Sequence, residues 1–187
     1  MNNKKWTFYF ELAARCHVFI LLNLYGWGKL LGGQFYRQGS LPPEVAHQTL
    51  SEAGSFDLAW TFFGHSFGYI LFIGLTQIVG AWLLLWEKTT LLGVAVLIPI
   101  LVNIVAVDAF FDVSFAIISA LVYLVLLGLV LFFNRSKLLA ALEILTKPGS
   151  TETRPWPVRI KTVGISLGIF ALTFGMEQLL LSLAGHH

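Results

Sequence analysis

Five long apolar stretches dominate this sequence and constrain its fold more than any other feature. They cover about Trp6 to Leu31, Trp60 to Trp86, Thr90 to Val107, Ser114 to Phe133, and Val163 to Leu183. A helix needs roughly 20 mostly apolar residues to cross the hydrocarbon core of a bilayer, and the alternation typical of strands is missing. We therefore predict an all-α polytopic membrane protein with five transmembrane helices in a single domain over residues 1–187.

The composition excludes several other classes of protein. Charged residues make up 12% of the chain and apolar residues 57%, with a mean hydropathy of +0.77. Soluble domains carry about 25% charged residues, so this chain has too little polar surface to face water all round. A net charge of +2 provides no basic patch for nucleic acid. Cys16 is the single cysteine, which excludes an intramolecular disulfide and a CxxC redox pair.

The basic residues outside the apolar stretches predict the orientation of the chain. If the N-terminus lies in the cytoplasm, only Lys29 and Arg37 fall on the outer side, and nine basic residues fall inside: Lys4, Lys5, Lys88, Arg135, Lys137, Lys147, Arg154, Arg159 and Lys161. This bias leaves the C-terminus outside. Glu11, Arg15 and His17 interrupt the first stretch, so we expect an uncleaved helix instead of a signal peptide.

The connections between the stretches differ in length and character. Residues 87–88 and 108–113 are so short that the second, third and fourth helices must be antiparallel neighbours. Residues 32–59 form an outer loop in which Pro43 can begin a short surface helix through Leu50. Residues 134–162 form a cytoplasmic linker with an amphipathic stretch from Lys137 to Leu145.

Two segments resemble the DoxX-like family of membrane proteins. Arg15 is followed by Tyr25-Gly26-Trp27-Gly28-Lys29-Leu30, and the run from Gly74 to Trp86 is similar to a glycine-rich stretch of that family, which often has a glutamate where Gln77 stands. The resemblance covers roughly Phe10 to Phe133. It implies a four-helix bundle to which the fifth, C-terminal helix is an addition. It also implies a quinone-linked redox role, and we expect a bacterial cytoplasmic membrane protein. The sequence has no CxxC pair or haem-ligand pattern, so a redox partner protein would have to supply electrons.

Three charged residues lie on one stripe of the first helix. Glu11 and Arg15 are one turn apart and are expected to form a structural ion pair. Lys29 lies about 21 Å from Arg15 along the helix axis, at 1.5 Å per residue, so it belongs to the opposite leaflet. A proton or substrate role for Glu11 and Arg15, and simple snorkelling of Lys29 to the headgroups, are the alternatives.

Several polar residues fall at the depth of Lys29, namely His65, Tyr69, Asn103, Asp108, Asp112 and Glu177. Ionisable groups in a membrane cost roughly 2.5 to 3.5 kcal/mol each on insertion scales, so they are paired, interfacial or functional. His65 and Tyr69 are expected on one face of the second helix. The ligand-binding candidates are Lys29, His65, Tyr69, Gln77, Asn103, Asp108 and Glu177, with Tyr25 and Trp27 as ring contacts. Interfacial anchoring is the alternative for His65, Asp108 and Asp112.

The leading interpretation is a redox-associated subunit that binds a quinone or a similar amphipathic molecule among the first four helices. A small proton-coupled transporter using Asp108, Glu177 and Arg15 is one alternative, although inverted repeats are missing. A noncatalytic assembly subunit is another. No catalytic residue is assigned. No metal site is expected, since the carboxylates and histidines lack ligand spacing, and His186 and His187 are either native or a tag remnant.

Overall fold

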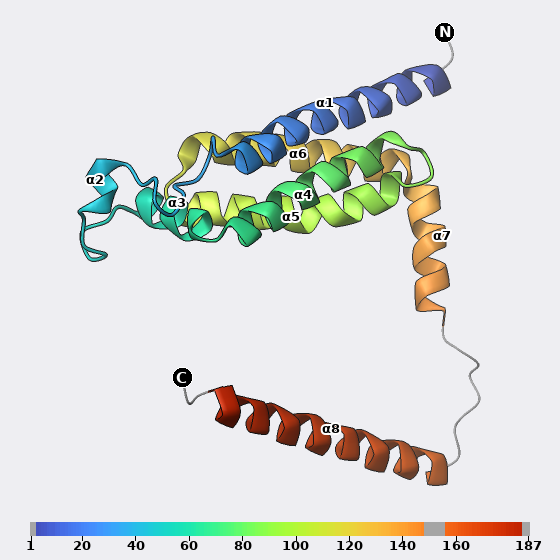
Figure 1. Ribbon diagram of the computed structural model, residues 1–187. Coiled ribbons are helices and arrows are strands. Elements are labelled where there is room, and N and C mark those ends of the chain that lie inside the picture. The colour runs from blue at the N-terminus through green and yellow to red at the C-terminus, as the bar shows by residue number, and fades with distance from the viewer. Residues whose placement is uncertain (1–2, 148–155, 185–187) are drawn as a thin grey trace. The chain divides into compact units, whose positions relative to one another are not determined.

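The computed structural model describes residues 3–147 and 156–184, in which every regular element is a helix (Figure 1). The helices are α1 (Asn3–Leu31), α2 (Pro43–Ala46), α3 (Ser55–His65), α4 (Phe67–Leu85), α5 (Thr90–Phe110), α6 (Ser114–Phe133), α7 (Arg135–Thr146) and α8 (Trp156–Ala184). Among the described residues, α1, α4, α5, α6 and α8 are long and apolar enough to cross a membrane. The prediction of an all-α chain with five such helices is confirmed.

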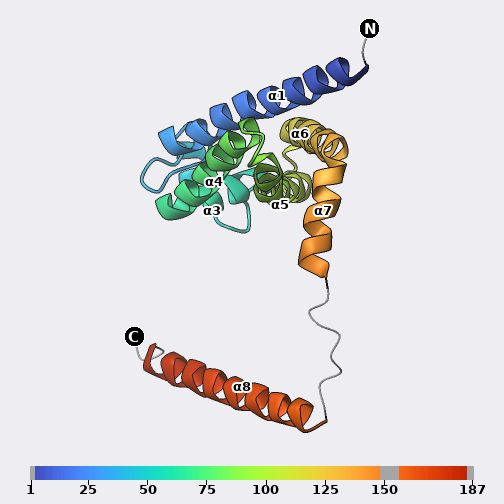
Figure 2. The same cartoon turned by 90° about the vertical axis from the view of Figure 1, so that its right-hand side faces the viewer.

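The chain divides into two compact units, residues 1–144 and 145–187, and each is described by itself. In the first unit, α1 packs against α4 and α6, and α5 packs against the same two helices (Figures 1 and 2). The four helices therefore enclose a common core, to which Val18, Leu22, Leu97 and Leu127 contribute side chains at most 1% exposed. The predicted neighbours in sequence, α4 with α5 and α5 with α6, are also neighbours in space.

Glycines allow two pairs of these helices to approach closely. A Cβ added to Gly93 of α5 would lie 2.8 Å from the amide nitrogen of Leu84 and 2.9 Å from the carbonyl oxygen of Gly80, both in α4. A Cβ on Gly26 of α1 would lie 3.0 Å from the carbonyl oxygen of Gly74. In a bilayer the hydrophobic effect does not drive helices together, so their association depends on close van der Waals packing, which small residues at the contact allow.

The second predicted span is two helices, and this part of the prediction was wrong. The break is at Ser66, whose backbone is extended (φ −110°, ψ 117°) and whose side chain accepts a hydrogen bond from the Tyr69 amide at 3.4 Å. Serine is a favoured N-cap because its side-chain oxygen accepts a hydrogen bond from a backbone amide of the first turn that has no partner within the helix. His65 therefore ends α3, and it does not share a helix face with Tyr69.

The segment between α1 and α3 is anchored by Tyr36 and Arg37. Arg37 donates to the carbonyls of Lys29 and Leu30, which caps the C-terminus of α1. The Tyr36 amide donates to the carbonyl of Trp60 at 3.3 Å. The Tyr36 hydroxyl lies 3.2 Å from Asp57, and burial together with this hydrogen bond raises the pKa of Tyr36, so the hydroxyl stays a donor at neutral pH. The short helix α2 ends at Ala46, before the predicted Leu50.

Four aromatic residues, Phe35, Phe56, Trp60 and Phe63, pack together where α1 ends, and we call them the aromatic cap. Phe56 stacks on Trp60 with ring centroids 4.1 Å apart, and Phe35 lies 5.7 Å from Trp60 and 5.6 Å from Phe63. Trp60 is 8% exposed. The predicted outer loop therefore includes the beginning of a packed helix, because α3 begins at Ser55.

The predicted amphipathic stretch 137–145 lies within α7, which follows α6 directly and runs across its direction (Figures 1 and 2). Leu139 and Leu142 of α7 are exposed, as expected for a helix that lies on a membrane surface. In the second unit, α8 begins at Trp156, earlier than the predicted Val163. His186 and His187 lie outside the described residues.

Substituting Gly93 tests the close approach of α4 and α5. We expect Gly93→Ala to lower the free energy of unfolding by about 1–3 kcal/mol, because the new methyl group meets backbone atoms that cannot rotate away. Unfolding in mixed micelles, followed by circular dichroism, measures the change. Gly128→Ala in α6 is the matched control, because a Cβ there meets nothing within 4 Å. Equal effects of the two substitutions would contradict the close packing.

Candidate functional site

The four packed helices enclose a cavity of about 360 Å³ on the side of the aromatic cap. All four helices line it, and the cap residues Phe35, Trp60 and Phe63 close one end. The polar side chains in its lining are Tyr25, Lys29, Gln34, Tyr69, Gln77, Asn103, Asp108, Ser119 and Tyr123. Apolar walls with a few polar groups are typical of sites for small organic ligands.

Two opposite charges are buried in this cavity. Lys29 in the last turn of α1 is 4% exposed, and Asp108 near the end of α5 is 5% exposed. The two groups interact electrostatically, yet the described part of the chain contains no ion pair between them within 4.0 Å. The Lys29 ammonium lies 5.7 Å from the centre of the Tyr25 ring and 6.0 Å from that of Phe35. The charges therefore balance without closing on each other.

Two buried oxygens in the lining have no hydrogen-bond partner among the described residues, Oδ2 of Asp108 and Oε1 of Gln77. Leaving a buried polar atom unpaired costs about 1–3 kcal/mol. Such atoms are rare in folded proteins, and a bound molecule or an ordered water commonly satisfies them. The cavity thus offers two acceptors beside the three donor hydrogens of the Lys29 ammonium.

The turn between α5 and α6 positions Asp108. The carbonyl of Asp108 accepts a hydrogen bond from the Val113 amide at 2.9 Å. Asp112 closes the turn with a φ of 59°, a left-handed conformation that aspartate tolerates better than most residues. Asp112 itself is exposed and does not line the cavity. The tight turn therefore places one of two nearby carboxylates inside the site and the other at the surface.

Six of the nine ligand-binding candidates line the cavity: Tyr25, Lys29, Tyr69, Gln77, Asn103 and Asp108. Trp27 is 52% exposed and does not. His65 is also exposed and outside the lining, since the helix break at Ser66 separates it from Tyr69. Glu177 belongs to α8 in the second unit, where its side chain is exposed.

The sequence reasoning missed Gln34, Ser119 and Tyr123. Ser119 and Tyr123 are four residues apart on α6, so they share one face of an otherwise apolar helix, and that spacing could have revealed them. Tyr123 is 5% exposed, and its ring centre lies 6.3 Å from that of Tyr25 on α1. Gln34 and Phe35 gave no such signal, because they follow α1 in an irregular segment.

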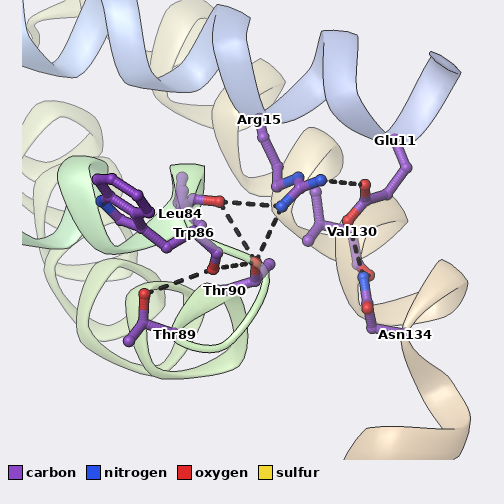
Figure 3. A network of polar contacts seen from close by, with 8 residues as sticks. All are labelled: Glu11, Arg15, Leu84, Trp86, Thr89, Thr90, Val130 and Asn134. Carbon is purple, nitrogen blue, oxygen red and sulfur yellow. Dashed lines mark hydrogen bonds and ion pairs between the residues drawn. The ribbon is translucent and has the colours of Figure 1, made fainter. Parts of the chain in front are cut away.

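A second polar site lies at the other end of the same helices (Figure 3). The expected ion pair is present, with 2.8 Å between Arg15 Nη2 and Glu11 Oε2. Arg15 Nη1 also donates to Thr90 Oγ1 at 3.0 Å and to the carbonyl of Leu84 at 3.3 Å. Asn134 Nδ2 donates to Glu11 Oε1 at 2.8 Å. The network therefore connects α1 with α4, α5 and the end of α6.

Most polar groups of this network have hydrogen-bond partners within the protein. Thr90 donates its hydroxyl to the carbonyl of Trp86 at 2.9 Å, and Asn134 also donates to the carbonyl of Val130 at 3.0 Å. A cavity of about 220 Å³ adjoins it. Because Arg15 already contacts a carboxylate, a hydroxyl and a carbonyl, this network is better suited to holding the helices together than to binding a ligand. Within the described residues, no three histidine, cysteine, aspartate or glutamate side chains are placed to hold a metal ion.

A comparison with curated proteins finds a relative of this chain. YwoB of Bacillus subtilis (strain 168), named an uncharacterized protein, is 37% identical over 130 residues, which cover 68% of this chain and 79% of YwoB. The chain belongs to the YwoB family. No family model matches the sequence, and no solved structure matches it either. Membership of the YwoB family therefore assigns no activity, and the function has to be argued from the site.

Breaking the ion pair tests its structural role. We expect Glu11→Gln to lower the free energy of unfolding by about 3–5 kcal/mol, because it leaves the Arg15 charge buried and uncompensated. The double variant Glu11→Gln/Arg15→Met should be less destabilised than the single one. Unfolding of the wild type, Glu11→Gln, Arg15→Met and the double variant in mixed micelles gives the coupling free energy from a double-mutant cycle. A coupling near zero would contradict a buried pair.

Proposed function

We propose that this YwoB-family protein is a DoxX-like, redox-associated membrane subunit that binds a quinone or a similar amphipathic molecule in the cavity between α1, α4, α5 and α6. The observation that carries this proposal is the burial of Lys29 and Asp108 on opposite elements of one aromatic-walled cavity. A buried pair that served packing alone would be expected to close into an ion pair, as Glu11 and Arg15 do.

The donors and acceptors match the two redox forms of a quinone head. The carbonyl oxygens of a quinone accept hydrogen bonds, which the Lys29 ammonium and the side-chain amides of Gln77 and Asn103 can donate. The hydroxyl groups of a hydroquinone donate, and the Asp108 carboxylate can accept from them. The balanced charge of Lys29 and Asp108 favours a neutral head over an anion or a cation.

The aromatic residues of the lining supply flat apolar surfaces for a ring. Tyr69 stacks on Phe63 at 5.7 Å with an interplanar angle of 10°, and Trp60 and Phe35 close the cavity beyond them. Aromatic faces attract a second ring in offset-stacked or edge-to-face geometry. These rings, together with the hydrogen-bonding groups of the lining, would hold the head of the ligand in one orientation.

The orientation follows from the distribution of basic residues. With the N-terminus in the cytoplasm, the Glu11 and Arg15 network lies at the cytoplasmic end and the cavity in the outer half of the bilayer. Within the described chain, no cysteine pair or cluster that could hold an electron-transfer centre is found. A redox partner protein would therefore exchange electrons with the bound molecule, with Lys29 and Asp108 orienting its head.

Binding of decylubiquinone to the protein in lipid vesicles tests this function. We expect Lys29→Met and Asp108→Asn each to weaken binding about tenfold or more, since a lost hydrogen bond to a charged group is worth about 1.5–3 kcal/mol. Quenching of tryptophan fluorescence measures the affinity, because Trp60 lines the cavity. His65→Ala is the control, since His65 is exposed and outside the lining. Unchanged affinity in both cavity variants, or no binding by the wild type, would refute the proposal.

A further inference from the structure

We infer that the ligand of the cavity reaches it sideways from the bilayer, between α4 and α5, and keeps a long apolar tail in that opening. The inference rests on the proposed function and narrows its ligand to a neutral ring carrying one hydrocarbon tail. The opening is formed by four lining residues that are exposed: Tyr69 and Phe72 on α4, and Pro99 and Asn103 on α5.

The packing of α4 against α5 explains why the opening lies there. The two helices are in backbone contact at Gly80 and Gly93. Beyond that contact, towards Asp108, the cavity lies between them. Pro99 is inside α5 at this level, and a proline there lacks an amide hydrogen and clashes with the carbonyl four residues earlier, which bends a helix. The two helices are thus in close contact at one end, and residues of both line the cavity at the other.

The position of Asn103 supports passage of a ligand through this opening. It lies within a helix that is apolar enough to cross a membrane, and its side chain is exposed while also lining the cavity. An amide facing hydrocarbon has no partner and costs free energy unless something pairs with it. A carbonyl or hydroxyl group passing through the opening would supply that partner. Phe72, which is 63% exposed, lies on the other side of the passage.

The other sides of the cavity have fewer exposed lining residues than the side between α4 and α5. At the aromatic cap, Trp60 is 8% exposed, and the neighbouring Ala59 and Val113 are 1% and 0% exposed. Between α1 and α6, Tyr25 is the one exposed residue of the lining, and it lies against Tyr123, which is 5% exposed. A ligand dissolved in water at the cap would therefore have to displace a packed core, whereas a ligand in the bilayer meets Phe72 first.

The volume of the cavity sets the shape of the ligand. Sites for small organic molecules have about 300–1,000 Å³, and this cavity, at about 360 Å³, is near the lower limit. It can enclose a substituted ring but not a long tail as well. The tail must leave through the opening at Phe72 and Asn103, where apolar surface and lipid both favour it.

Rates of binding test the opening separately from the site. We measure association and dissociation of decylubiquinone by stopped-flow quenching of tryptophan fluorescence, with the full-length protein in phosphatidylcholine vesicles. Phe72→Ala should raise the association and the dissociation rate constants by about threefold or more, because a widened passage lowers the barrier in both directions. Phe72→Leu should give a smaller effect in the same direction.

Leu75→Ala is the matched control. Leu75 is 42% exposed on the same helix and does not line the cavity, so its substitution should leave both rates unchanged. Three results, each with normal binding by the wild type, would refute entry between α4 and α5 and leave the proposed function standing. They are unaltered rates in Phe72→Ala, weaker binding by Phe72→Ala without faster association, and an equal effect of Leu75→Ala. Failure of the wild type to bind decylubiquinone would refute the proposed function itself, and the inference with it.

Discussion

The buried guanidinium of Arg15 is the contact on which the arrangement of the first unit depends. A charge in an apolar core needs an opposite charge and further hydrogen bonds to offset its desolvation. Arg15 meets this need with groups from three places in the chain, namely Glu11 on its own helix, the carbonyl of Leu84 and the hydroxyl of Thr90. Rotation of α1 or sliding of α4 against α5 would break the hydrogen bonds of the guanidinium to Leu84 or Thr90, so the network fixes the register of these helices.

The opposite end of the unit is built on another principle. There the polar groups are not closed into a network: Lys29 and Asp108 face one cavity without an ion pair, and oxygens of Asp108 and Gln77 lack partners in the described chain. The satisfied end can hold the helices at a fixed spacing, and the open end can then keep its cavity without collapse. Strain and unpaired polar groups are tolerated where the rest of a fold is well determined.

Much of this could be predicted from the sequence because it depends on local spacing. The length and hydropathy of the apolar stretches predicted all five long helices, and the spacing of Glu11 and Arg15 predicted their ion pair. The break at Ser66 was missed, since the apolar pattern runs through it without interruption. Because of that break, His65 lies outside the cavity lining. Residues of the aromatic cap line the cavity instead, and hydrogen bonds from Tyr36 to Asp57 and to the carbonyl of Trp60 hold this region together.

The sequence by itself determined the class of the protein and its five long apolar helices, because hydropathy and a rise of about 1.5 Å per residue are properties of a single helix. Only the tertiary structure decided which of those side chains meet. The rotation of each helix depends on contacts between distant segments, such as Gly80 against Gly93 and Gly26 against Gly74. Those contacts turn Lys29, Gln77 and Asp108 into one cavity and leave Trp27 exposed.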